Sequence, residues 1–414
     1  MPAILQALFL SAGYNTTLVC VGAGLLGAAA GAIGVFVLLR KRSLLADAMS
    51  HATLPGVAIG FMAGVALFGD GRNLPLMLMG AAMSAGLGVL AVDWIRNNTR
   101  LSEDTAIGTV LSTFFALGMV LLTVIQEMDV SGQAGLEGFL LGATAGMLKG
   151  EALMIAAAAA CVALAALAFM KQFSLVCFDA DYAQARGWSV RRIDLLMLGL
   201  LLAVVVIGLK TVGLVLIIAL AIIPPVAARF WTDRLPAMVA ISSGIGAAGS
   251  YVGAAISSIA PNLPTGGVIV LVLFFLFLVS MLVSPVYGLV AAILRHRRFQ
   301  RVVHERQGLL ALARGEPVFD PLTIRVLGRR GFLRGDGSPT PEGLSAGGRM
   351  SRDQALWNRY REDYPEDAHA LADWSLKPID DVLPRDLVSE LEHKLAPAAA
   401  GAPGPRGPRG GALA

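Results

Sequence analysis

The stretch GAIGVFVLLRKRSLLADAMSHATLPGVAIGF, residues 31–61, decides the fold class of this chain. An apolar run ends in the basic triplet at 40–42, and a second apolar run starts directly after it and carries Asp47 and His51. A helix that crosses a bilayer needs about 20 mainly apolar residues, and Lys and Arg gather on its cytoplasmic side. The stretch therefore predicts two membrane helices joined by a short cytoplasmic turn.

The composition of the whole chain agrees with a membrane protein. Of its 414 residues, 56% are hydrophobic and 15% are charged, and the mean hydropathy is +0.69. Soluble domains are nearer 25% charged, so an ordinary soluble, disordered or nucleic-acid-binding protein is excluded for the chain as a whole. The three cysteines lie apart in apolar stretches and form no CxxC pair. This spacing argues against a disulfide framework and against a thiolate metal site.

The apolar segments predict an all-α polytopic membrane protein with eight or nine transmembrane helices. Residues 193–230 form either one long helix or two helices separated near Lys210. The Gly-rich residues 132–148 form either a re-entrant segment or a surface helix. The candidate spans lie near residues 17–39, 44–68, 74–95, 106–125, 151–170, 194–209, 211–228, 237–258 and 267–294.

Basic clusters orient these spans through the positive-inside rule. If all clusters are cytoplasmic, nine spans place the N-terminus outside, residues 126–150 outside and the C-terminus inside. The N-terminus has neither a charged region nor a cleavage motif, so no cleaved signal peptide is predicted. The clusters are Arg40-Lys41-Arg42, Arg96 with Arg100, Lys171, Arg186 with Arg191-Arg192, Arg229 with Arg234, and the residues from Arg295 onward.

The composition changes sharply near Arg295, where charged residues become frequent. We therefore predict a transmembrane domain over residues 1–294 and a cytoplasmic appendage over residues 299–395. Residues 396–414 are rich in Ala, Gly and Pro without apolar periodicity, which predicts a disordered tail.

Asp47 and His51 are the residues with the clearest chemical potential. Their i, i+4 spacing places them on one helix face, and His51 lies nine residues beyond Arg42, a depth of about 13 Å. An ionisable side chain in the bilayer interior costs about 2.5–3.5 kcal/mol, so it must face a polar cavity, a partner or a permeating ion. Zinc, iron and manganese all accept this ligand pair. From the residues alone, the alternative stays open that Asp47 and His51 are an internal pair that only joins helices.

The polar loop at 177–196, CFDADYAQARGWSVRRIDLL, predicts a short amphipathic helix that ends in Ala185-Arg186-Gly187. Such a helix either docks on a partner or forms a solvated loop. Pro224 and Pro225 predict a kink in a membrane helix, which acts either as a hinge or as a fixed packing feature.

The sequence contains no motif by which the chain itself would supply the energy for transport. A Walker A sequence, GxxxxGK[ST], is absent, so ATP is not bound by that route. Coupling carboxylates at mid-membrane depth are also missing, which argues against a secondary transporter.

Four stretches carry a resemblance to a known family. RKRSLLADAMSHATLPGVAIGF resembles the signature of the permease subunits of zinc, manganese and iron ABC importers, the family-3 ABC permeases. The resemblance covers residues 15–294 in the family's order, and one departure is Pro225, where the family usually has alanine. The other stretches are SEDTAIGTVLSTFFALGMVLL (102–122), LKTVGLVLIIALAIIPPVAARFWTDRL (209–235) and GSYVGAAISSIAPNLPTGGVIVLV (249–272).

The resemblance implies a permease in the cell (inner) membrane, working as a homodimer or with a paralogous permease. It also implies cytoplasmic ATP-binding subunits and an extracytoplasmic metal-binding protein as partners. Asp47 and His51 match the family's acidic and histidine positions on the metal path, and residues 185–187 correspond to the coupling helix. The chain itself would be a transport subunit without enzymatic activity or covalently bound cofactor. A two-fold axis would offer up to four metal ligands.

The C-terminal region resembles a degenerate repressor. PLTIRVLGRRGFLRGDGSPTPEG, residues 321–343, predicts a helix, a glycine stop and a β-wing, and thus a small cytoplasmic α/β winged-helix-like domain. The region is similar to the iron- and manganese-dependent repressors of the diphtheria-toxin-repressor family, but residues 299–343 are too few for a complete helix-turn-helix. Of that family's metal positions only His369 remains; the others hold Gln354, Asn358, Leu376 and Lys377.

The sequence therefore predicts the permease subunit of an ABC importer for Mn, Zn or Fe, with a structural or regulatory appendage that binds no specific nucleic acid. The alternative is a membrane-anchored metal-responsive regulator that acts through the C-terminal domain. Siderophore and cobalamin permeases lack the DAMSHATLPG signature. Asp plus His does not distinguish Mn, Zn and Fe.

Overall fold

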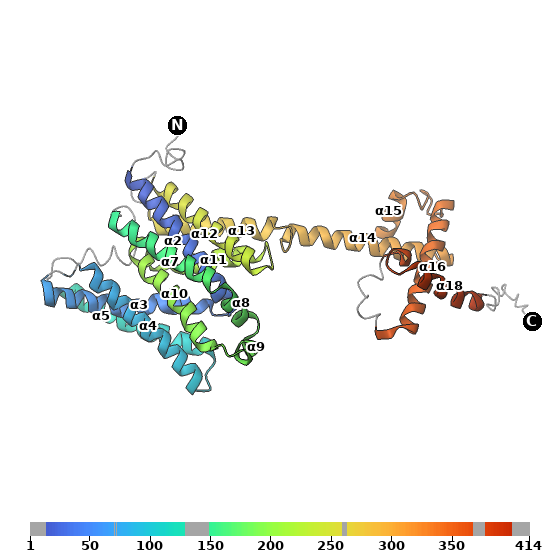
Figure 1. The fold of residues 1–414 in the computed structure, drawn as a ribbon. Coiled ribbons are helices and arrows are strands. Elements are labelled where there is room, and N and C mark those ends of the chain that lie inside the picture. The colour runs from blue at the N-terminus through green and yellow to red at the C-terminus, as the bar shows by residue number, and fades with distance from the viewer. Residues whose placement is uncertain are drawn as a thin grey trace, which may run out of the picture. The chain divides into compact units, whose positions relative to one another are not determined.

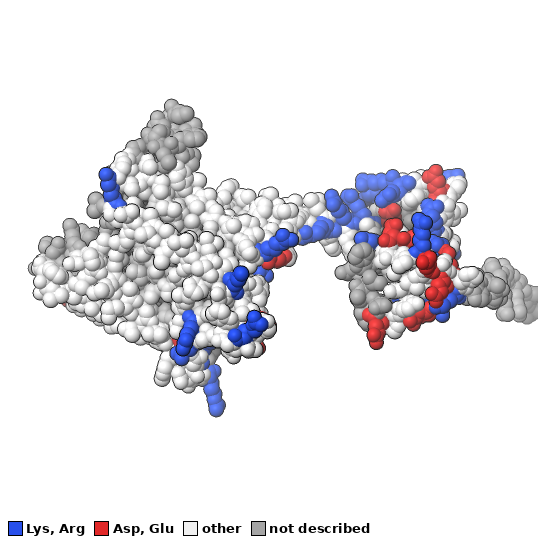
Figure 2. All heavy atoms as spheres, viewed as in Figure 1, with Lys and Arg blue, Asp and Glu red and all other residues white. Residues whose placement is uncertain are grey.

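The computed structural model describes residues 14–69, 71, 73–128, 149–258, 263–366 and 377–399. Over these residues the chain is helical, with one isolated antiparallel bridge between Leu333 and Pro339. It divides into two compact units, 1–292 and 293–414. On the face that Figure 2 shows, charged side chains are rare on the first unit and frequent on the second. That the first part is a transmembrane domain and the second a cytoplasmic appendage remains a prediction.

The first unit contains the helices that are apolar enough to cross a membrane. Within the described residues, seven helices pass that criterion, or eight if the bent pair α7 and α8, which meet at 64°, is one span. The predicted eight helices agree with the upper count, whereas nine would require the short α11. The helices are α2 (Tyr14–Leu39), α3 (Ser43–Phe68), α4 (Leu74–Asn98), α5 (Glu103–Glu127), α7 (Lys149–Ala168), α8 (Met170–Phe178), α9 (Ala180–Ala185), α10 (Val190–Val212), α11 (Leu214–Arg229), α12 (Leu235–Ser257) and α13 (Thr265–Val283).

Two predicted spans end elsewhere than expected. Residues 193–230 form two helices, but the break lies at Gly213 rather than near Lys210, because Gly213 adopts a φ of 84° that favours glycine. The predicted last span, 267–294, ends at Val283. Ser284 precedes a proline and is therefore extended, with a ψ of 132°. The helical residues after the break belong to α14.

The helices of the first unit form two groups (Figure 1). In one group α2 packs against α12, α11 and α7, and α13 packs against α11 and α12. In the other group α3 packs against α4 and α5. The helix α10 contacts members of both groups, namely α2, α3 and α4. The apolar side chains of these helices form a main core and a smaller cluster around Phe61 and Leu209.

Glycine allows the closest helix contacts in both groups. A Cβ atom on Gly56 of α3 would overlap the carbonyl group of Gly80 on α4. The pair Gly27 and Gly246 forms the same contact between α2 and α12. Membrane helices associate without a hydrophobic driving force, so close backbone packing of this kind is a main source of their affinity.

The second unit is helical and corrects the prediction of an α/β winged-helix domain. Between α15 and α16 the expected wing is a turn with the single Leu333–Pro339 bridge, too short for paired strands. One apolar cluster surrounds Leu327, and another surrounds Trp357. The elements are α14 (Leu289–Arg314), α15 (Pro321–Arg329), α16 (Pro341–Asp363), η3 (Ile379–Asp381) and α18 (Arg385–Ala399).

Three other predictions meet the limits of the described residues. The helix α18 extends to Ala399, four residues into the segment 396–414 that is predicted to be a disordered tail, and the tail stays a prediction. The rest of that tail, most of residues 126–150 including the segment 132–148, and His369 lie outside the described residues.

The glycine contact between α3 and α4 predicts the effect of one added methyl group. We expect Gly56→Ala to destabilise the protein by about 1–3 kcal/mol, because the Cβ must displace backbone atoms. Gly108→Ala on α5 is the matched control, since no atom lies within 4 Å of its added Cβ. Thermal unfolding of the purified protein in detergent measures both variants. An unchanged melting temperature for Gly56→Ala would contradict the contact.

Candidate functional site

The predicted pair Asp47 and His51 forms in the structure. His51 Nε2 lies 3.3 Å from Asp47 Oδ1 on consecutive turns of α3. The side chains are 23% exposed for His51 and 36% for Asp47, so both remain accessible from one side. The other ring nitrogen, His51 Nδ1, is buried and has no hydrogen-bond partner among the described residues.

Contact with α5 fixes the orientation of the His51 ring. Phe115 of α5 meets the imidazole edge-on, with ring centroids 5.1 Å apart. One turn further along α5, a Cβ on Gly118 would lie 2.6 Å from Leu54 Cβ. The missing side chain at Gly118 therefore allows α5 to approach α3 and places Phe115 beside His51.

One chain supplies only two metal donors at this place. No group of three or more His, Cys, Asp or Glu side chains is close enough to hold a metal within the part of the chain that the structure describes. Zinc in proteins usually takes three or four protein ligands. The pair therefore suits a transient contact with a passing ion or one half of a site that a second chain completes.

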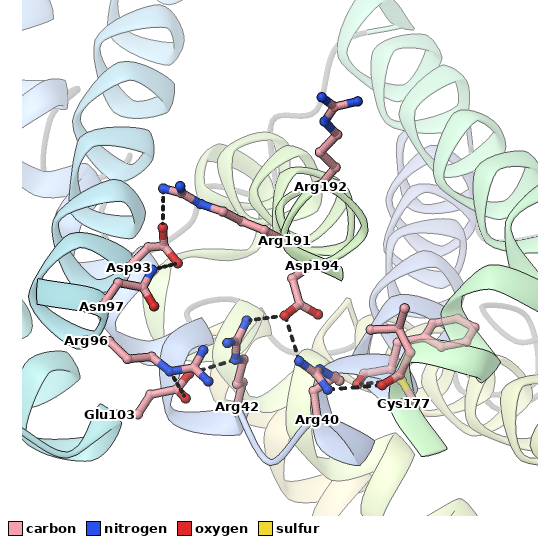
Figure 3. Close-up of polar contacts among 12 residues, drawn as sticks. Arg40, Arg42, Asp93, Arg96, Asn97, Glu103, Cys177, Arg191, Arg192 and Asp194 are labelled. Carbon is pink, nitrogen blue, oxygen red and sulfur yellow. Dashed lines mark hydrogen bonds and ion pairs between the residues drawn. The ribbon is translucent and has the colours of Figure 1, made fainter. Parts of the chain in front are cut away.

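A charged cluster lies at the ends of several helices, among them the start of α3, the helix that carries Asp47 and His51 (Figure 3). Lys41 adopts a left-handed φ of 60°, which ends α2 and turns the chain directly into α3. Arg40 and Arg42 flank this turn and both bind the carboxylate of Asp194 on α10, at 2.7 and 3.3 Å. Arg40 also donates to the carbonyl of Val176 on α8, at 3.0 Å.

The cluster continues toward α4 and α5. Arg42 Nε lies 2.7 Å from Glu103 at the start of α5, and Arg96 of α4 lies 3.2 Å from the same carboxylate. A more exposed pair, Arg191 with Asp93, joins α10 to α4 at 2.8 Å. Ion pairs thus connect the ends of α2, α3, α4, α5 and α10 on one side of the bundle.

Sequence reasoning used Arg40 and Arg42 only to orient the spans and missed Asp194. The Asp194 side chain is 11% exposed and that of Arg42 is 8% exposed, so each buried charge requires the opposite charge of the other for compensation. The available signal was a lone carboxylate, in RRIDLLML, one turn inside an apolar span. A buried charge of that kind predicts a buried partner, although the sequence does not name it.

The loop predicted to dock on a partner contains the expected short helix, α9. The Asp179 side chain caps its first turn by accepting from the Tyr182 N–H at 2.8 Å. At the other end Gly187 has a φ of 83°, which lets the chain reverse after Ala185 and Arg186. Large aromatic side chains around the helix are exposed, to 65% for Phe178, 50% for Tyr182 and 44% for Trp188.

The consecutive prolines lie in α11 and are buried. A Cβ on Gly34 of α2 would lie 2.8 Å from the ring carbon Cγ of Pro225. Pro225 therefore packs tightly against the backbone of α2. This contact favours the packing interpretation of the kink over the hinge interpretation, and the hinge remains a prediction.

Comparison with known proteins gives a consistent result for the first unit. Residues 14–284 match the ABC 3 transport family. The chain is 40% identical over 298 residues to the manganese transport system membrane protein MntC of Bacillus subtilis, covering 72% of this chain and 67% of that protein. It is 36% identical over 292 residues to the zinc transport system membrane protein TroC of Treponema pallidum, covering 70% and 96%.

A solved structure, PsaBC from Streptococcus pneumoniae in complex with Fab, is also similar. The TM-score is 0.58 at 32% sequence identity, and the match covers 67% of this chain and 94% of the other. The family match ends at residue 284, so it covers the helices around the Asp47–His51 pair and the charged cluster but not the second unit.

The buried cluster predicts unequal effects for two similar substitutions. We expect Asp194→Asn to destabilise the protein by about 3–5 kcal/mol, because Arg40 and Arg42 lose the charge that compensates their burial. Asp93→Asn, the control, should cost about 0–1 kcal/mol, because its partner Arg191 is 69% exposed. Thermal unfolding of the purified variants measures both; equal shifts would contradict the proposed importance of Asp194.

Proposed function

The chain belongs to the ABC 3 transport family, and on that premise we propose that it is the permease subunit of an importer for a divalent transition metal ion, Mn, Zn or Fe. The relatives support this cargo because their names refer to manganese and zinc transport. A protein named as a probable iron transport system membrane protein, from Haemophilus influenzae, is 34% identical over 254 residues.

The observation that carries the proposal is the Asp47–His51 pair. Carboxylate and imidazole are ligands that all three metals accept, and they lie within 3.3 Å of each other on a helix apolar enough to span a membrane. Their partial exposure leaves one side of the pair accessible to an ion. The unpartnered His51 Nδ1 supports a functional role, since a purely structural histidine would gain from a second hydrogen bond.

A dimer would complete the metal path. Two copies related by a two-fold axis, or one copy with a paralogous permease, would bring two such pairs toward a shared pore. Four donors are the number that transition metals commonly take, whereas the described residues of one chain bring two together here. An extracytoplasmic metal-binding protein would deliver the ion to the outer side of this pore.

Cytoplasmic ATP-binding subunits would supply the energy, and this chain would act as a transport subunit without enzymatic activity. The loop around α9 fits the docking role because it presents exposed aromatic side chains and the residues Ala185, Arg186 and Gly187. Both neighbours of α9 bind Arg40: α8 through the Val176 carbonyl and α10 through Asp194. A displacement of the loop would therefore reach the turn between α2 and α3, directly before Asp47. Pro224 and Pro225 are the candidate hinge in α11.

The second unit would lie on the cytoplasmic side and serve a structural or regulatory role. The basic residues that follow α13 support this side by the positive-inside rule. The regulator alternative needs metal ligands, yet Gln354 and Asn358 occupy two of the corresponding positions, and Asn358 accepts a hydrogen bond from Arg361 instead. Specific binding of a nucleic acid is therefore not part of the proposal.

The metal path predicts the behaviour of two variants. Asp47→Ala and His51→Ala should abolish metal accumulation in cells that depend on this importer, because each removes half of the donors from the chain. Asp93→Asn is the control, since its carboxylate pairs with Arg191 outside the proposed path. Uptake of ⁵⁴Mn or ⁶⁵Zn at equal membrane levels measures the effect. Wild-type uptake by His51→Ala would refute the pathway role.

The docking loop predicts a loss of the ATP-binding partner rather than a loss of folding. Gly187→Glu should give a protein that folds but no longer retains the partner subunit during purification. Gly315→Glu is a matched control, because both glycines have a positive φ, 83° and 71°, and open space around them. Co-purification of the two subunits is the measurement. Equal loss of the partner in both variants would assign the effect to backbone strain and would remove the docking role.

A further inference from the structure

A basic pocket of 520 Å³ lies within the second unit, between α14 and α15, and has no place in the proposed transport path. Each helix contributes one continuous face. The positions on α14 repeat at four-residue intervals, as do those on α15, which is the spacing of a single helix side. The lining residues are His296, Arg297, Gln300, Arg301 and His304 on α14, and Leu322, Arg325, Val326 and Arg329 on α15.

The packing of α14 on α15 fixes the walls of this pocket. A Cβ on Gly308 of α14 would lie 2.6 Å from side-chain carbons of Leu327 and Thr323, so the two helices are in close contact there. His304 Nδ1 adds a polar contact, 3.0 Å from Thr323 Oγ1 and 3.1 Å from Asp320 Oδ2. The Asp320 carboxylate also caps α15. The pocket is therefore bordered by a built interface rather than by loose surface side chains.

Four arginines give the pocket a positive charge. Arg297, Arg301, Arg325 and Arg329 are exposed, and none of them forms an ion pair or side-chain hydrogen bond within the described residues. No carboxylate lines the pocket in that part of the chain. Figure 2 shows basic side chains gathered along α14 and over α15. Guanidinium groups bind phosphate oxygens with paired hydrogen bonds, so such a concentration suits a phosphate group.

Two features favour a phospholipid over a soluble phosphate. Leu322, which lines the pocket, is 50% exposed, and its neighbours in the sequence Phe319 and Ile324 are 83% and 41% exposed. A soluble phosphate would make no contact with such apolar side chains, whereas the acyl chains of a lipid would. Only five residues also separate α14 from α13, the last candidate membrane helix. A group of arginines directly after a membrane span is typical of segments that bind anionic lipid headgroups.

We propose that the pocket between α14 and α15 binds the phosphate headgroup of an anionic membrane phospholipid, with the exposed apolar side chains against its acyl chains or the bilayer surface. The basic groups at the two faces would share one phosphate, and the apolar rim would provide the contact that a soluble ligand lacks. Anionic lipids would then hold the second unit at the membrane, in addition to its covalent connection to α13.

The test uses the full chain purified in detergent and three ligands. They separate the contribution of the phosphate charge from that of the acyl chains. Dioctanoyl phosphatidylglycerol represents the anionic lipid, dioctanoyl phosphatidylcholine the neutral lipid, and glycerol 3-phosphate the soluble phosphate. The pocket variant is Arg301→Gln with Arg325→Gln. The control is Arg334→Gln with Arg349→Gln, which removes the same charge from exposed positions of the same unit that do not line the pocket. Binding is measured by isothermal titration calorimetry.

We expect saturable binding of the phosphatidylglycerol, at least tenfold tighter than the phosphatidylcholine and the glycerol 3-phosphate. The pocket variant should bind it at least tenfold more weakly, and the control should bind as the wild type does. Arg301→Lys with Arg325→Lys, which keeps the charge but loses the paired hydrogen bonds, should fall between them. Equal loss in the control would overturn the site. Tighter binding of glycerol 3-phosphate, or of a 20-base-pair DNA added as a fourth ligand, would overturn the lipid assignment.

Discussion

The burial of Asp194 between Arg40 and Arg42 is the interaction on which the arrangement of the first unit depends. These side chains are 8–18% exposed, so none of them can remain charged without the others. Because α2 and α4 arrive at this place with their C-terminal ends while α3, α5 and α10 leave from it, the ion pairs also fix the direction of five helices.

The sequence predicted the parts of the structure that depend on local chemistry. Long apolar runs define helices, and the i, i+4 spacing of Asp47 and His51 determines their shared face because the helix period is fixed. The short helix before Gly187 was predictable for the same reason. The break at Gly213 was predicted three residues early, since Lys210 drew attention by its charge, whereas the helix ends where the backbone can turn.

The contacts between distant segments were not predictable in the same way. Asp194 and Arg40 are 154 positions apart, and nothing in the local sequence identifies one as the partner of the other. The wing expected within residues 321–343 rested on turn residues such as Gly335 and Gly337. Turn residues predict a reversal of the chain, but paired strands also need neighbours to bind, and the described residues provide only one bridge. Likewise the pocket between α14 and α15 depends on the crossing of two helices.

The position of the charged cluster has a consequence for how the bundle can move. Ion pairs hold the helices at one end, and Asp47 and His51 lie only about 6–12 Å along α3 from that end, at 1.5 Å per residue. A tilt of about 10° around the cluster would shift the far end of a 26-residue helix such as α3, about 39 Å long, by about 7 Å. The same tilt would move Asp47 and His51 by only about 1–2 Å. A pivot at this end thus combines a large displacement of the far helix ends with a nearly stationary Asp47–His51 pair, without breaking a buried ion pair.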